Sequence, residues 1–151
     1  MKKLLFICLA AFAAASCTQE KQQSKPLYMW FDCEGNYATL SHPDSIRYYV
    51  SKIHDMGFTD VVVDVKSIMG ETLYKSDIAP YMGEWEGVTR PENYDLLGYF
   101  IEEGHKLGMR VHGSLNVFAG GHNYFDRGII YGDHADWQSQ VYTCLLYTSD
   151  A

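Results

Sequence analysis

Apolar and polar positions along the chain follow two different periods, and together they predict alternating strands and helices. Residues 27–34 (LYMWFDCE), 58–66 (FTDVVVDVK) and 109–117 (MRVHGSLNV) are short apolar runs rich in aromatic and β-branched side chains, which is typical of strands. Residues 44–56 and 94–107 carry apolar side chains at helical spacing. The predicted order is therefore strand, helix, strand, helix, strand.

The boundaries of the first predicted helix have recognisable signals. The segment from Ser41 to Asp44 has the spacing of a capping box, with a proline in the first turn. A glycine at position 57 supplies the stop. One face of the helix collects five apolar residues, namely Ile46, Tyr49, Val50, Ile53 and Met56.

Strands that alternate with helices imply a parallel sheet, and two architectures have this order. A dinucleotide-binding sheet requires a glycine fingerprint after the first strand, whereas only Gly35 stands there. A (β/α)₈ barrel tolerates long loops after its strands, as at residues 67–92, and needs only short connections before them. We therefore expect an α/β fold, the N-terminal portion (about three βα units) of a TIM-type (β/α)₈ barrel. Its middle strand is expected to be covered on both faces.

Both ends of the chain differ from a folded domain. Residues 1–16 read as a signal peptide, and the small residues before Cys17 (AASC) are typical of a lipoprotein whose cysteine is acylated. The alternative is an ordinary signal peptide with an incidental cysteine. Residues 17–25 form a polar tether, and residues 144–151 (CLLYTSDA) resemble a translated sequencing adapter. The partial barrel is thus expected over residues 26–143.

Composition narrows the function classes. With 47% hydrophobic and 15% aromatic residues the chain can build a core, so disorder is excluded. Twelve basic against 19 acidic residues give a net charge of −7, which argues against nucleic acid as a partner. Cys33 is the one cysteine left once both ends are set aside, so no disulfide framework is expected. The sequence calls for no cofactor.

Five segments, taken in order and spacing, resemble the bacterial family-ten-like glycosyl hydrolase barrels, which are often lipoproteins. They are residues 57–66 (GFTDVVVDVK), 73–80 (LYKSDIAP), 94–97 (YDLL), 101–108 (IEEGHKLG) and 111–116 (VHGSLN). The resemblance implies a hydrolase of O-glycosyl bonds in the bacterial cell envelope, periplasmic or at the cell surface. Its substrate would be a polysaccharide or a peptidoglycan-type glycan, and a lipid anchor would hold it to the membrane. Lys66, Ser114 and Val117 depart from the family's pattern, which bears on the substrate and not on the fold.

Candidate site residues follow from the period of two in the strands, which brings charged side chains to the carboxyl ends of the predicted strands. Charged groups inside a barrel are costly unless they are paired, so they favour a site over filler. The alternative is an ion-pair network that closes the barrel mouth. The residues expected to bind substrate are Asp32, Glu34, Asp64, Lys66, His112, Asn116 and Trp85. Trp85 stands in the long loop, with no helix or strand face predicted to bury it; the alternative is that it packs that loop onto the barrel.

The catalytic carboxylates are not identified, because in many such barrels they stand on strand four or later, here beyond residue 143. Two other functions remain open. One is a lipid-anchored glycan-binding barrel without catalysis. The other is a metal-dependent polysaccharide deacetylase, which a faint similarity at residues 31–35 suggests. The spacing of His112, His122 and His134 argues against that second alternative, and no metal site is expected.

Overall fold

The computed structural model describes residues 25–139. The predicted signal peptide (1–16), the acylated Cys17, most of the tether (17–25) and the adapter-like segment (144–151) lie outside the described residues. Within residues 25–139, no helix has the length and apolar character needed to cross a membrane.

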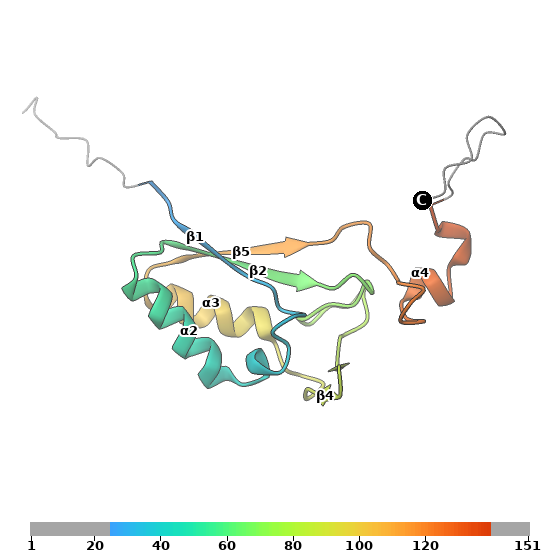
Figure 1. Cartoon of the computed structure of the whole chain (residues 1–151), viewed down its shortest axis with the longest axis horizontal. Helices are drawn as coiled ribbons and strands as arrows, with labels where there is room; N and C mark the ends of the chain where they lie inside the picture. The colour runs from blue at the N-terminus through green and yellow to red at the C-terminus, as the bar shows by residue number, and fades with distance from the viewer. Residues whose placement is uncertain (1–24, 140–151) are drawn as a thin grey trace, which may run out of the picture.

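A parallel sheet of three strands forms the centre of the fold (Figure 1). The strands are β1 (Tyr28–Phe31), β2 (Asp60–Lys66) and β5 (Arg110–Leu115), in the order β1-β2-β5. Both neighbouring pairs are parallel, which confirms the predicted sequence of βα units. Both edges of this sheet are open, so the described residues show an α/β unit and no closed barrel.

The first strand is shorter than predicted, because the chain turns directly after Phe31. The backbone carbonyl of Asp32 accepts hydrogen bonds from the Asn36 main-chain N–H at 3.2 Å and from its side-chain amide at 2.8 Å. The Asp32 carboxylate accepts the N–H of Gly35 at 3.0 Å. Asp32 and Glu34 therefore belong to a turn, and the prediction that they lie within the first strand (residues 27–34) is wrong.

Helices α2 (Pro43–Asp55) and α3 (Leu96–Lys106) lie side by side under the same face of the sheet (Figure 1). A 3₁₀ turn, η1 (Thr39–Ser41), precedes α2, and the capping position is His42. The predicted capping box is wrong, because the Ser41 hydroxyl donates to the Tyr37 carbonyl at 2.6 Å. At α3 the Asp95 carboxylate does cap the helix, accepting the Gly98 N–H at 2.9 Å.

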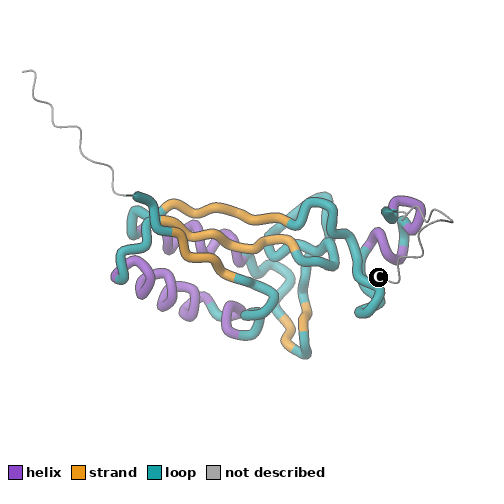
Figure 2. Tube along the Cα trace, turned by 45° about the horizontal axis from the view of Figure 1, so that its top comes forward, coloured by secondary structure: helices purple, strands orange, loops and turns teal. Residues whose placement is uncertain are grey.

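The core lies between these helices and one face of the sheet. Val61, Val63 and Val65 of β2 are buried against this layer, whereas Val62 and the other even-numbered residues after it remain partly exposed. The expectation that β2 is covered on both faces is therefore wrong for the described residues (Figure 2). The helices contribute Ile46, Val50, Ile53, Leu96 and Phe100 to the core.

The loops after β2 and β5 carry structure of their own. The β2–α3 loop holds a short hairpin of β3 (Glu84–Trp85) and β4 (Val88–Thr89), and it buries Met69, Leu73 and Met82. The segment after β5 ends in α4 (Ile129–Gly132) and η2 (Ala135–Trp137). Both loops leave the carboxyl edge of the sheet, so this edge is where side chains from distant parts of the chain meet (Figure 2).

Candidate functional site

Trp30 and Asp64 meet on the uncovered face of the sheet. The parallel register places Trp30 beside Val62, so Asp64 lies one step further toward the carboxyl edge on the same face. The indole Nε1 of Trp30 donates to Asp64 Oδ2 at 2.9 Å. Trp30 is 60% exposed, so its ring remains available beside a carboxylate that is already held in position.

Lys66 and Asn116 also come together, but through the backbone of Asn116. The register of β2 and β5 breaks between Asp64 and Lys66, and this irregularity marks the end of the strand. Lys66 Nζ donates to the carbonyl of Asn116 at 2.7 Å and to that of Ala119. Burial lowers the pKa of Lys66. Lys66 therefore holds the loop after β5 in place, and the exposed side chain of Asn116 lies at the start of that loop.

Glu34 is the most perturbed acid at this edge. Its Oε1 atom is shielded from solvent and has no hydrogen-bond partner among the described residues. Burial raises the pKa of Glu34, and the nearby carboxylates of Asp32, Asp64 and Glu71 raise it further, against one backbone hydrogen bond that lowers it. A carboxyl group with these properties is suited to hold a proton and donate it to a ligand.

A hollow of about 130 Å³ lies beside Glu34, between the turn after β1 and the β3–β4 hairpin. Trp85 lines the opposite wall, so the structure brings together two residues that are 51 positions apart (85 − 34). The prediction that Trp85 has no strand face is wrong, because it belongs to β3 and packs edge-on against Phe125 at 5.1 Å. The other lining residues are Gly35, Asn36, Tyr37, Ala38, Thr39, Glu86 and Val88.

His112 lies away from this edge. Its Nε2 is 2.8 Å from Asp60 Oδ1, and Arg110 donates to both Asp60 oxygens at 2.7 and 2.8 Å. Asp60 begins β2 and Arg110 begins β5, so the cluster sits at the opposite, amino end of the strands. The expectation that His112 lies with the candidate residues at the carboxyl ends of the strands is therefore wrong.

The Asp60 cluster explains how a carboxylate is tolerated at full burial. Asp60 is 0% exposed, and it also accepts one hydrogen bond from the Thr59 hydroxyl. These donors, with Arg110 first, hold the pKa of Asp60 well below its usual range. Sequence reasoning missed Asp60, although the register of two parallel strands that start at 60 and 110 would have paired it with Arg110.

Two further arginines that sequence reasoning did not select hold the loops of the site together. Arg127 binds the Glu71 carboxylate with two hydrogen bonds of 2.7 and 2.8 Å. The guanidinium of Arg90 lies 3.6 Å from the centre of the Tyr37 ring. A planar, permanently charged group can make such paired and stacked contacts, which is a signal that sequence alone does not locate.

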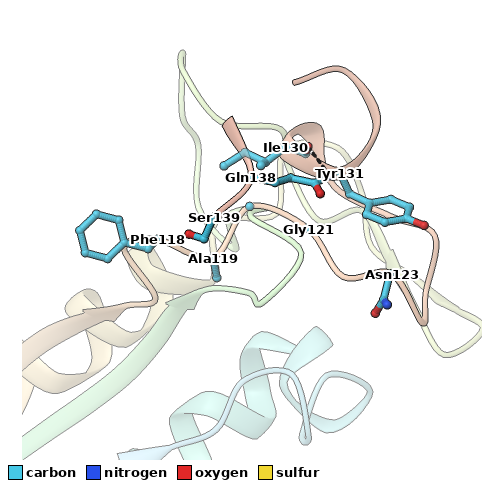
Figure 3. Close-up of a pocket in the computed structure, with 9 residues that line it drawn as sticks. Phe118, Ala119, Gly121, Asn123, Ile130, Tyr131, Gln138 and Ser139 are labelled. Carbon is cyan, nitrogen blue, oxygen red and sulfur yellow. Dashed lines mark hydrogen bonds between the residues drawn. The ribbon is translucent and has the colours of Figure 1, made fainter. Parts of the chain in front are cut away.

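A second pocket, of about 320 Å³, lies within the segment after β5 (Figure 3). Its wall combines apolar residues and glycines with the polar side chains of Asn123, Tyr131, Gln138 and Ser139, and Gln138 donates to the Ile130 carbonyl at 3.3 Å. Ser139, the last described residue, forms part of its rim. Because no acidic, basic or histidine side chain lines this pocket, we place the candidate site at Glu34 and Trp85 instead.

Among residues 25–139, no group of three or more histidine, cysteine, aspartate or glutamate side chains is arranged to hold a metal ion.

No protein-family model matches the chain. It is 28% identical over 124 residues to an S-layer-related protein of Niallia circulans. The match covers 78% of this chain, which spans about 8% of the length of that relative. The similarity is distant and partial, and it assigns no family.

Proposed function

We propose that this protein is a glycoside hydrolase of the bacterial cell envelope, and that the described residues form the first βα units of its (β/α)₈ barrel. The observation that carries the proposal is the hollow at the carboxyl edge, which Glu34 and Trp85 line together, with one buried carboxyl oxygen of Glu34 unpartnered among the described residues. Sugar sites combine these two elements, because a pyranose presents hydroxyl groups at its rim and an apolar face.

The sheet supports the barrel part of the proposal. All three strands are parallel, both long helices cover one face, and the other face carries Trp30, Asp64 and Lys66. In a (β/α)₈ barrel the helices form the outer ring and the uncovered face becomes the interior. The polar residues at the strand ends would then line the mouth, where enzymes of this architecture bind substrate.

The roles of the described residues follow from their contacts. Glu34 would donate a hydrogen bond from its protonated carboxyl group to a sugar oxygen, and Trp85 would stack against the ring. Glycoside hydrolysis requires a second carboxyl group across the scissile bond, about 5–5.5 Å away for retention or about 6.5–9.5 Å for inversion. We assign that group to a later strand of the barrel.

The proposed location rests on two observations. The sequence before Cys17 is typical of a lipoprotein signal, and the distant relative carries the name of an S-layer-related protein. We therefore expect Cys17 to be acylated and the protein to partition into detergent with the membrane fraction. A Cys17→Ser variant that still incorporates labelled palmitate as the parent does would refute the anchor.

One observation favours a second function, a glycan-binding barrel without catalysis. The hollow of about 130 Å³ is smaller than the roughly 300–1,000 Å³ of ordinary ligand pockets, so it engages only part of a sugar unit. Such a shallow contact suits a surface that holds a glycan chain as well as one that cleaves it. Turnover by the full-length protein separates the two functions.

The decisive experiment compares Glu34→Ala with Glu92→Ala in the full-length protein on a panel of β-linked and amino-sugar glycans. Glu92 is an exposed acid of the β2–α3 loop that does not line the hollow, and it serves as the control. Loss of the hydrogen bond that the neutral Glu34 carboxyl group donates should lower kcat/KM about 2- to 12-fold, while the control stays at the parent value. Binding without turnover would favour the glycan-binding function. Neither binding nor turnover of any glycan would refute both.

A further inference from the structure

Trp85 is shared between the hollow and a group of aromatic side chains on the segment after β5. Phe125 contacts Trp85 at 5.1 Å between ring centres, and both Tyr124 and His122 contact Phe125, at 5.0 and 5.3 Å. We call these four residues the aromatic cluster. It continues the surface of the hollow from the β3–β4 hairpin onto a segment about 40 residues further along the chain (125 − 85).

The aromatic cluster is exposed where a folded protein usually hides such rings. Tyr124 is 82% exposed and Phe125 is 41% exposed. Trp30, at the same edge of the sheet, is 60% exposed. Contiguous exposed aromatic rings on a soluble surface typically mark a binding site.

The segment that carries the cluster is anchored to the β2–α3 loop. Arg127 binds Glu71 through a bidentate pair that is largely buried, and its backbone pairs with that of His122. Gly128 has φ +116°, and a side chain there would lie 2.3 Å from the Gly121 Cα atom. Only glycine permits this approach, and the Arg127–Glu71 pair with the His122–Arg127 bridge holds the backbone on both sides of Tyr124 and Phe125. Rings held on a fixed backbone lose little conformational entropy when a ligand binds.

The charges around the cluster indicate which kind of ligand fits. The guanidinium of Arg127 already binds Glu71 and lies 3.7 Å from the Glu84 carboxylate, so its charge is compensated within the protein. The exposed Glu86 borders the hollow, and the exposed Asp126 directly follows Phe125 in the chain. An acidic polymer would meet carboxylates here, whereas a neutral glycan can stack its ring faces on the aromatic side chains.

We propose that the aromatic cluster extends the sugar cleft and binds further units of a neutral glycan chain, so that the ligand is a polymer and not a mono- or disaccharide. This inference rests on the proposed function of the hollow. One sugar unit contacts Glu34 and Trp85, and the following units lie over Phe125 and Tyr124. The small size of the hollow is consistent with this, since most of the contact area then lies outside it.

The experiment measures how affinity depends on chain length in the full-length protein. Neutral β-linked oligosaccharides of two and six units, one glucose series and one N-acetylglucosamine series, are titrated by calorimetry. Where an oligosaccharide is hydrolysed, kcat/KM replaces affinity. The variant is Tyr124→Ala, because this side chain is 82% exposed and its loss does not disturb the core. Tyr48→Ala on α2, where the ring is 57% exposed, is the matched control.

The expected result is tighter binding of six units than of two in the parent protein. Tyr124→Ala should weaken the six-unit ligand about 2- to 12-fold and leave the two-unit ligand unchanged. Tyr124→Phe, which keeps the ring, should restore the parent affinity, and Tyr48→Ala should match the parent throughout.

Equal affinity for both lengths in the parent, or the same loss at both lengths in Tyr124→Ala, would overturn the extension while the proposed function stands. Tighter binding of an apolar peptide than of any oligosaccharide at the cluster would also overturn it. No binding of either series, the two-unit ligands included, would refute the proposed function and the extension with it.

Discussion

Replacing Arg90 tests how the two walls of the hollow are joined. Arg90 is 3% exposed, and it donates to the Ser41 hydroxyl at 2.8 Å and to the Tyr37 carbonyl at 2.9 Å. Its guanidinium also stacks on the Tyr37 ring at 3.6 Å. The Tyr37 hydroxyl in turn donates to the Met82 carbonyl at 2.8 Å, so one cluster ties the β1–α2 turn to the β2–α3 loop.

The contacts of Arg90 set the expected magnitude. Two charge-assisted hydrogen bonds contribute about 1.5–3 kcal/mol each, and a desolvated cation over an aromatic ring contributes about 2 kcal/mol. Against this, taking the cation out of water costs several kcal/mol, and its Nη1 has no partner within residues 25–139. Burial accordingly lowers the pKa of Arg90. The favourable and unfavourable contributions therefore nearly cancel.

The near cancellation gives different expectations for two substitutions. Arg90→Met removes the buried cation, retains an unbranched side chain, and leaves the Tyr37 carbonyl bonded to Ser41, so it should cost only about 1–2 kcal/mol. Arg90→Lys keeps the charge and loses the planar stack and the fork of donors. It should therefore cost more, about 3–5 kcal/mol.

The assay is equilibrium unfolding in urea, followed by circular dichroism, with free energies from linear extrapolation. Arg47→Met on α2 is the control, because the Arg47 side chain is 59% exposed, its pair with Asp44 lies at the surface, and Glu103 keeps its hydrogen bond from Lys106. The control should change the free energy of unfolding by less than about 1 kcal/mol. A lysine variant as stable as the parent, with a methionine variant that is much less stable, would refute the reasoning, because charge alone would then matter.

Three further predictions concern Glu34, two glycines and Cys33. Because burial raises the Glu34 pKa above 4.5, the folded state loses stability as pH rises from that value. In urea unfolding, Glu34→Gln should therefore gain stability relative to the parent between pH 4.5 and neutrality. A difference in the free energy of unfolding that does not depend on pH would contradict this. Gly128→Ala should lower the free energy of unfolding by about 2 kcal/mol or more, since its Cβ would lie 2.3 Å from the Gly121 Cα atom. Gly57→Ala, where φ is positive but no atom lies close, should lower it by about 1–2 kcal/mol. Equal losses of stability in the two variants would contradict the steric argument. Burial first, and Asp64 second, raises the pKa of Cys33 to about 12, so a thiol reagent at pH 8 should modify Cys33 only as the protein unfolds. Immediate modification of Cys33 in the native protein, located by peptide mass mapping, would contradict this.

The order of strands and helices was predictable because it depends on local periodicity. The apolar spacing in Ile46, Val50 and Ile53 requires one buried helix face whatever covers it, and the structure buries these residues. The run of valines before Asp64 likewise predicted the central parallel strand. Each signal lies within a few residues of the chain.

The prediction of element boundaries failed where a polar side chain could form a hydrogen bond with either of two local partners. Ser41 has the spacing of a capping box, yet its hydroxyl donates to the Tyr37 carbonyl and accepts a hydrogen bond from Arg90. Asp32 continues the alternation of β1, yet its carboxylate closes a turn with Gly35. In both places a hydrogen bond to the backbone competes with the regular element, and local sequence leaves that competition undecided.

Residue types at the candidate site were visible in the sequence, whereas their partners were decided by tertiary structure. Trp85 meets Glu34 and Phe125 only because two long loops leave the same edge of the sheet. His112 and Asp60 form a pair at the opposite edge because the parallel register aligns the amino-terminal residues of β2 with those of β5. A contact between residues some 50 positions apart depends on the strand register and on the path of the loops, and the spacing of apolar residues predicts neither. The sequence thus determined which chemical groups the edge of the sheet carries, and packing determined which of them face one another.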